Sequence, residues 1–246
     1  MTFRCIPSLI INGPNFVKGQ QFKNHIYVGD PNNVLKIFND NDVHEVSIVD
    51  PFIRDLTKQQ IALLGKAFSN CFLPISYGGG VKKLSDVREL NKVGAEKFIF
   101  EIENIKDNDL TQTVSTELGK QANILHVPFL NYNSGGLNIR SSRSLFRRSI
   151  FLDWSYIKDI CVNFGEVIFT DVRKEGLRSG FDQNALTMIS SEIIGQQPIL
   201  YQGGVSCKTD LKKIRNYGFS GALVGAAYLY SSKNKSVNVG FFDDDV

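Results

Sequence analysis

Residues 75–86 read ISYGGGVKKLSD, and residues 199–210 read ILYQGGVSCKTD. The two stretches align without a gap at an offset of 124 residues, about half of the 246-residue chain. Each contains a short apolar run, then a pair of glycines, then a polar segment that ends in aspartate. This order is typical of a β-strand, a tight turn and the start of a helix. A strand–turn–helix unit repeated half a chain apart predicts a protein built from two similar halves.

Other positions obey the same offset. Two aspartates, one in each half, are expected to lie in the first turn of a helix, and two glycines are expected to end these helices with a positive φ. The pairs are Asp86 with Asp210 and Gly94 with Gly218. A second echo relates EVSIVD at 45–50 to EVIFTD at 166–171, and each begins with glutamate and ends with aspartate.

Apolar runs of strand length alternate along the chain with amphipathic segments of helical length, such as 30–43 and 57–70. The predicted strands are 4–11, 45–50, 73–77, 97–100, 123–130, 166–171, 198–202 and 221–225. Strict alternation over about 250 residues predicts one (β/α)₈ TIM barrel spanning 1–246, with halves of approximately 1–122 and 123–246. An open doubly wound sheet is the alternative, but it does not explain a half-length repeat.

Composition indicates an ordinary globular chain, with 42% hydrophobic and 22% charged residues and a net charge of +3. This charge is too small to predict a nucleic-acid or membrane partner. No stretch approaches the roughly 18 consecutive apolar residues of a membrane span, and the N-terminus does not resemble a signal peptide. The cysteines lack zinc-site spacing, and they are Cys5, Cys71, Cys161 and Cys207. We therefore expect a reduced, cytoplasmic protein with no metal and no cofactor.

The glycine turns are candidate phosphate sites, because bare N–H groups near a helix start can bind an anion. In barrels the turns after the late strands often do so. Gly203 and Gly204 follow the seventh predicted strand, while Gly225 and Ala226 follow the eighth. The equivalent turn of the first half contains Gly78, Gly79 and Gly80. The alternative is that these glycines only make tight turns.

Three parts of the chain, 4–29, 73–101 and 166–230, resemble the cyclase subunit of imidazole glycerol phosphate synthase. The motifs are RCIPSLIINGPNFVKG, YGGGVKKLSDVRELNKVGAEK, and QGGV followed by VGAA. The stretch VKGQQFKNHIYVGDPNNVLKIFN at 17–39 is similar to a paralogous branch of that family. Members of this branch accompany surface-polysaccharide genes and are implicated in acetamidino modification of sugars.

The resemblance implies a partner glutaminase that makes ammonia. In the family, ammonia enters at the N-terminal end of the barrel through a gate of four charged residues and is used at the opposite face. The matching residues are Arg4, Glu45, Lys97 and Glu166. Each starts a predicted strand, where a buried charge is costly unless it is paired. The alternative is that these charges are solvated at the rim.

The chain departs from the family where catalysis is expected. The family's two acid–base aspartates correspond to Ile10 and Pro128, and neither of these can move a proton. Glu101 and Ile102 replace an Asn-Thr pair that receives the first phosphate, and a carboxylate repels a phosphate at close range. The first-half site, with Gly79 and Gly80, is therefore interpreted as degenerate.

Other residues at the C-terminal face are candidates for substrate contact. Lys18 matches a family lysine, and Glu175 falls where the family has an aspartate. Asp50 and Asp171 end their strands. We predict a catalytic role for these four residues, with a solvated loop as the alternative for each. The segment 138–151 is basic through Arg140, Arg143, Arg147 and Arg148. The histidines, which are His25, His44 and His126, make no metal pair.

The resemblance implies a barrel subunit of a glutamine-dependent amidotransferase of acetamidino-sugar type. Its expected partners are a glutaminase, a phosphorylated or nucleotide-sugar substrate, and an ATP-dependent sugar amidotransferase. Two alternatives stay open. One is a histidine-biosynthesis cyclase, and the other is a non-catalytic ammonia conduit that activates the glutaminase.

Overall fold

The computed structural model describes residues 2–40, 43–105, 109–140, 149–193, 195 and 197–230. Eight parallel strands close into a barrel, because the last strand pairs with both the seventh and the first. In order around the barrel they are β1 (Arg4–Asn12), β4 (Val46–Val49), β5 (Ile75–Gly78), β6 (Ala95–Glu101), β7 (Asn123–Asn133), β10 (Glu166–Asp171), β11 (Ile199–Gln202) and β12 (Gly221–Val224). The predicted (β/α)₈ barrel is confirmed.

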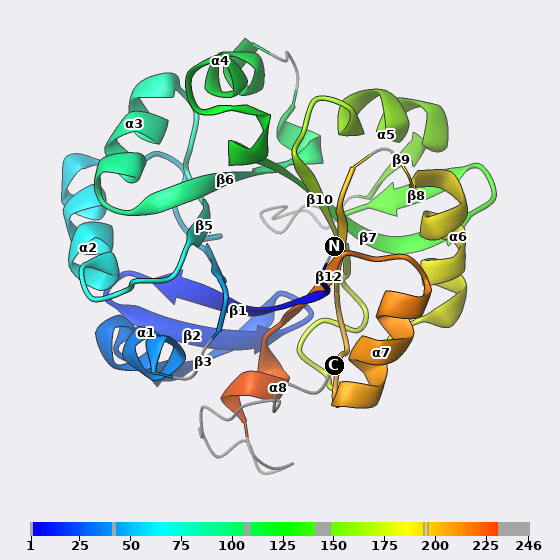
Figure 1. The fold of residues 1–246 in the computed structure, drawn as a ribbon, viewed down its shortest axis with the longest axis horizontal. Helices are drawn as coiled ribbons and strands as arrows, with labels where there is room; N and C mark the ends of the chain where they lie inside the picture. The colour runs from blue at the N-terminus through cyan, green and yellow to red at the C-terminus, as the bar shows by residue number, and fades with distance from the viewer. Residues whose placement is uncertain are drawn as a thin grey trace.

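Helices surround the strands in chain order (Figure 1). They are α1 (Pro31–Asn39), α2 (Lys58–Phe68), α3 (Leu84–Lys92), α4 (Asp109–Leu118), α5 (Trp154–Cys161), α6 (Gln183–Ile193), α7 (Lys208–Asn216) and α8 (Ala226–Leu229). Two 3₁₀ turns, η1 (Ile102–Asn104) and η2 (Lys120–Ala122), flank α4. The local sequence explains where two of the helices begin. Asp30 caps the N-terminus of α1 before Pro31, and Thr57 and Gln60 form a capping box at the N-terminus of α2. No helix of the described ranges is long and apolar enough to cross a membrane.

Two β-hairpins extend the barrel at equivalent places in the two halves. β2 (Asn15–Gln20) and β3 (Lys23–Gly29) follow β1, and β8 (Gly136–Ile139) and β9 (Ile150–Asp153) follow β7. Each first hairpin strand runs antiparallel to its barrel strand. The sequence did not predict these four strands, because they are only four to seven residues long and interrupt the alternation of barrel strands and helices.

The repeated motif has the same local structure in both copies. Gly94 and Gly218 end their helices with φ values of +111° and +85°. Asp86 accepts a hydrogen bond from the backbone N–H of Lys82 at 3.1 Å, and Asp210 accepts one from Ser206 at 2.9 Å. The predicted roles of these glycines and early-turn aspartates are confirmed.

Apolar side chains form two separate clusters. The larger one lies between the strands and the surrounding helices. The smaller one fills the barrel interior and contains Ile6, Ile99, Ile124, Ile168, Leu200 and Leu223. Inward and outward side chains alternate along a strand. Polar residues two positions before or after these six therefore also face the barrel axis.

Candidate functional site

A ring of four ion pairs lies at the N-terminal end of the barrel, where β1, β4, β6 and β10 begin. Arg4 Nη1 is 3.0 Å from Glu45 Oε2 and 3.1 Å from Glu166 Oε1. Lys97 Nζ is 3.0 and 3.1 Å from the same two atoms. Burial alone lowers the pKa of Arg4, but Glu166 and Glu45 raise it above its ordinary value. Each cation thus contacts both anions, and the ring is electrically balanced.

Apolar side chains follow the ring along the barrel axis. Ile6, Ile99 and Ile168 come two residues after Arg4, Lys97 and Glu166 on their strands, and they belong to the interior cluster. Ser47 occupies the matching position on β4, two residues after Glu45. Its hydroxyl oxygen is buried and has no hydrogen-bond partner among the described residues. One polar atom therefore remains available inside an otherwise apolar section.

A chain of polar side chains links β7, β10, β11 and β1 nearer the C-terminal ends of the strands. His126 Nε2 lies 2.9 Å from Thr170 Oγ1. The Thr170 hydroxyl donates to Gln202 Oε1 at 3.0 Å, and Gln202 Nε2 donates to Ser8 Oγ at 3.0 Å. Burial lowers the pKa of His126 to about 4. The imidazole is therefore neutral at physiological pH.

A cavity of about 730 Å³ opens at the C-terminal ends of the strands. It extends from the polar chain to the first-half glycine turn and the β2–β3 hairpin. Its charged or titratable lining residues are His25, Asp50, Lys82, Glu101, Asp109, His126 and Glu175. Burial lowers the pKa of His25, whose ring packs edge-on against Phe52 at 5.0 Å. The volume falls within the range of small-molecule sites.

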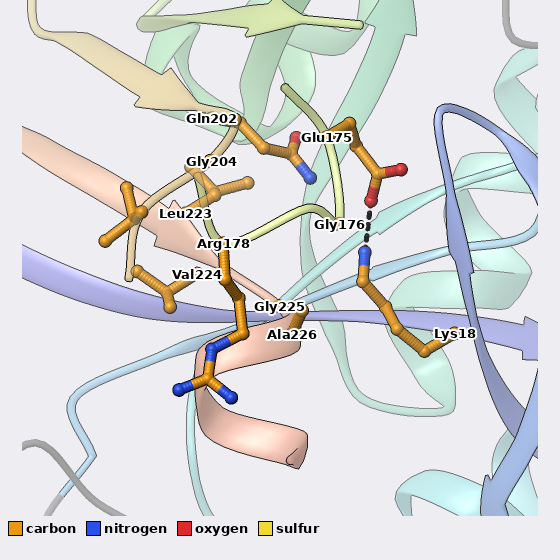
Figure 2. Close-up of a pocket in the computed structure, with 12 residues that line it drawn as sticks. Lys18, Glu175, Gly176, Arg178, Gln202, Gly204, Leu223, Val224, Gly225 and Ala226 are labelled. Atoms are coloured by element: carbon orange, nitrogen blue, oxygen red, sulfur yellow. Dashed lines mark hydrogen bonds and ion pairs between the residues drawn. The ribbon is translucent and has the colours of Figure 1, made fainter. Parts of the chain in front are cut away.

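A second, tighter pocket of about 20 Å³ lies beside the second-half glycine turn (Figure 2). Gly203, Gly204, Gly225 and Ala226 all line it, and their role in binding phosphate stays a prediction. Lys18 and Glu175 form a buried ion pair at its edge, and Glu175 lines both pockets. A methyl group on Gly225 would lie 2.9 Å from Lys18 Nζ, so a residue with a side chain at position 225 would displace this lysine.

Arg178 supplies the second cation of this pocket. It has a φ of +54°, which is uncommon for a residue with a side chain. Its guanidinium extends beside α8 (Figure 2). It donates a hydrogen bond to the carbonyl oxygen of Tyr230 at 2.9 Å. The sequence reading did not single out Arg178, because a loop arginine has no distinctive spacing.

The two glycine turns pack against equivalent aspartates. A methyl group on Gly79 would lie 2.7 Å from the carbonyl oxygen of Asp50, and one on Gly203 would lie 2.9 Å from that of Asp171. These φ values, +151° and +135°, also favour glycine. Both turns are therefore built for close backbone approach, whatever ligand each one meets.

Asp50 and Asp171 hold the loops that follow their strands. Asp50 Oδ1 accepts hydrogen bonds from the backbone N–H groups of Phe52 and Ile53 at 2.9 and 3.2 Å. Asp171 accepts from the backbone and side chain of Arg173. Asp50 lines the larger cavity, whereas Asp171 lines neither pocket and is fully buried. Geometry thus favours a positioning role for Asp171, and its catalytic role stays a prediction.

Two of the four positions interpreted as substituted lie at the larger cavity. Ile10 and Glu101 line it, and Glu101 is the register partner of His126. Ile102, buried, begins η1. Pro128, also buried, pairs with Thr170, and its carbonyl accepts from the backbone of Arg140. Of the basic segment, Arg143, Arg147 and Arg148 lie outside the described residues.

His126 and His25 are cavity residues that the sequence reading set aside. The signal for His126 was its position, two residues before Pro128 on the same strand. If Pro128 faces the barrel axis, so does His126. His25 lies on the unpredicted hairpin, so its sequence gave no comparable signal.

Comparison with known proteins gives matches over nearly the whole chain. Residues 4–234 match the family described as histidine biosynthesis protein. A Pseudomonas aeruginosa protein with the provisional name imidazole glycerol phosphate synthase subunit hisF2 is 26% identical over 244 residues, which cover 98% of this chain and 96% of that protein. The Endomicrobium trichonymphae imidazole glycerol phosphate synthase subunit HisF is 26% identical over 231 residues, covering 92% and 87% of the two chains.

Proposed function

The chain belongs to the histidine biosynthesis protein family, and from this premise we propose that it is the ammonia-using barrel subunit of a glutamine-dependent amidotransferase. One observation carries the proposal. The closed ring of Arg4, Glu45, Lys97 and Glu166, the apolar barrel interior and the large cavity follow one another along the strands.

The barrel interior suits ammonia better than ammonium. An apolar lining raises the free energy of a charged group, so it favours the neutral form of the nitrogen. Ser47 Oγ supplies a single buried hydroxyl without a partner among the described residues, to which a passing molecule can hydrogen-bond. We interpret the ion-pair ring as the gate between this interior and the N-terminal face.

The glutaminase is proposed to dock at the N-terminal face. Phe72 lies in the connection that leads into β5, at the same end of the barrel as the ring, and 89% of its surface is exposed. An aromatic side chain exposed to this extent is a typical anchor of a protein interface. A glutaminase seated there would release ammonia beside the ring.

The proposed substrate is a phosphorylated or nucleotide sugar. In the second-half pocket the backbone of Gly203 and Gly204 and the cation of Arg178 offer donors to a phosphate oxygen. The first-half side of the large cavity instead contains Asp50, Glu101 and Asp109, with Lys82 as a cation. Carboxylates accept hydrogen bonds from sugar hydroxyls but repel a second phosphate. This difference between the second-half pocket and the first-half side of the cavity supports a ligand that contains both an anionic group and a polyol.

An acetamidino product places a further requirement on the reaction. Ammonia replaces an amide oxygen only after this oxygen has been converted to a leaving group. We therefore include an ATP-dependent sugar amidotransferase as a third component, which activates the acetamido group.

Reconstitution tests this proposal. The chain is co-expressed with candidate glutaminases and the ATP-dependent enzyme, and an acetamido nucleotide sugar is supplied with glutamine. We expect a stable complex with a glutaminase and an amidinated sugar. Failure to bind any glutaminase, with no product from glutamine or from ammonium salts, would contradict it.

The histidine-pathway cyclase is the second candidate, and the names of the relatives favour it. Ile10 and Pro128 stand against it, because neither can act as an acid or a base. Assay of the ribulosyl imidazole precursor with ammonia separates the two. A rate near that of a genuine cyclase would assign the chain to histidine biosynthesis.

A non-catalytic conduit is the third candidate, and the same two substitutions favour it. In that case the chain would stimulate its glutaminase, yet removing polar residues from the large cavity would leave amidination unchanged. Direct amination by the ATP-dependent enzyme with free ammonia, without this chain, would be equally fast.

A further inference from the structure

We infer that His126 orients ammonia and accepts the proton that its nitrogen loses on adding to the substrate. This inference rests on the proposed function, and it assigns a proton-moving group where Ile10 and Pro128 have none. His126 faces the cavity floor on β7, two residues beyond Ile124 of the apolar interior cluster. Ammonia that leaves this interior therefore meets the imidazole as it enters the cavity.

The hydrogen-bond chain fixes the tautomer of His126. The Thr170 hydroxyl has one proton, which it donates to Gln202 Oε1. Gln202 Nε2 donates onward to Ser8, so the orientation of its amide is consistent with accepting from Thr170. Thr170 must therefore accept at its contact with His126 Nε2. In a neutral ring with Nε2 protonated, Nδ1 is the acceptor.

Nδ1 is also accessible. His126 lines the cavity. Its Nδ1 is not among the fully buried polar atoms that have no hydrogen-bond partner. No described residue donates a hydrogen bond to it. An ammonia molecule in the cavity can donate one N–H to Nδ1 and keep its lone pair free for the substrate.

Burial lowers the pKa of His126 to about 4. A neutral ring is what the orientation of ammonia requires. A charged imidazolium would give a proton to ammonia and remove its lone pair, whereas the neutral ring cannot. The groups around it are Glu101 on β6, the uncharged Thr170 on β10 and Gln202 on β11. Asp50, Lys82 and Glu175 line the same cavity.

The proton-transfer step is balanced as follows. The ammonia lone pair forms the C–N bond, and the π electrons of the electrophilic C=O or C=N bond move to its heteroatom. A proton passes from nitrogen to Nδ1, and the imidazolium forms in a cavity that Glu101 also lines. The ring then returns this proton to the heteroatom, so His126 ends neutral.

The first test needs no substrate. Nitrogen-15 spectra of the histidine-labelled full chain distinguish protonated from unprotonated ring nitrogens, and the chain has only three histidines to assign. We expect a protonated Nε2 and an unprotonated Nδ1 for His126 at neutral pH. Thr170→Val should release the ring into both tautomers, and Thr170→Ser should restore the original one. A protonated Nδ1 in the unaltered protein would overturn the inference.

The second test uses the reconstituted complex, with ammonium chloride as the nitrogen source. Gln keeps hydrogen-bonding capacity but cannot take a proton, so His126→Gln should lower kcat about 10²- to 10⁴-fold with little change in the KM of the sugar. His44→Gln, at an exposed position outside the cavity, is the matched control. A kcat within threefold of the unaltered complex would overturn the inference, whereas an inactive unaltered complex would instead count against the proposed function.

Discussion

Lys97 Nζ lies 3.0 Å from Glu45 Oε2, although Lys97 is on β6 and Glu45 directly precedes β4, and β5 separates these two strands. The contact therefore crosses the interior of the barrel rather than running along its wall. With Arg4 and Glu166 it completes a closed ring in which each charge has two partners of opposite sign. A closed ring of this kind is the geometry expected of the proposed gate, and its role as a gate stays a prediction.

Replacing Lys97 tests the energetic part of this arrangement. Lys97→Met leaves two carboxylates facing one arginine, so we expect the free energy of unfolding to fall by about 2 kcal/mol, between the values of exposed and buried pairs. Urea denaturation measures the change. Lys92→Met, which removes an exposed pair with Glu89, should cost about 0.5 kcal/mol or less. Equal losses in the two variants would contradict a stabilising ring.

The buried pair of Lys18 and Glu175 should be strongly coupled. Either Lys18→Met or Glu175→Gln leaves its partner buried without a counter-charge, and we expect each to destabilise the fold by about 3–5 kcal/mol. The double variant should recover part of this loss, because no unpaired charge remains. Additive losses in a double-mutant cycle would show that the two side chains do not interact in solution.

The two halves should differ in anion binding. Inorganic phosphate is expected to bind at the second-half pocket, and Arg178→Ala should weaken this binding about tenfold, which corresponds to about 1.4 kcal/mol. Glu101→Gln removes the repulsion in the first half and should add a second, weaker site. Phosphorus NMR titration counts the sites. A first-half phosphate site in the unaltered protein would refute the assignment of Glu101.

Stability should depend on pH through His126. Its pKa falls from 6.5 to about 4 on folding, so the unfolded chain binds more protons between these values. The folded state therefore loses stability as the pH falls through this window, by up to about 2 kcal/mol between about pH 7.5 and about pH 5. In His126→Gln this component is absent, so the stability difference from the unaltered protein should shrink at the lower pH. A difference that stays constant would show that burial does not suppress protonation.

Residues that start or end an apolar run were placed well from sequence. Glu45 and Glu166 begin such runs, and the repeat aligned them, so their common end of the barrel followed from strand direction. The family resemblance predicts Glu101 at the first-half phosphate position, and the structure places it in the lining of the larger cavity. These predictions succeeded because parallel strands fix which end of the barrel a residue occupies.

Residues whose role depends on side-chain packing were not placed. His126 looked like an ordinary mid-strand residue, since its partner Thr170 lies 44 positions away. The hairpin strands β2 and β3 were not predicted, because β2 pairs with β1 and β3 pairs in turn with β2, and neither pairing is visible in the sequence. Asp171 ends its strand as expected, yet its hydrogen bonds to Arg173 could be seen only in the structure.

Isotope competition in the reconstituted complex measures the route of nitrogen through the barrel. Glutamine labelled with nitrogen-15 at the amide is supplied together with an excess of unlabelled ammonium, and the label in the amidinated sugar is read by mass spectrometry. If ammonia passes the ring at Lys97 and travels through the barrel, most of the product should carry the label, and Lys97→Met should reduce this fraction. Product that carries the isotope ratio of the bulk solution would show that ammonia reaches the cavity from outside.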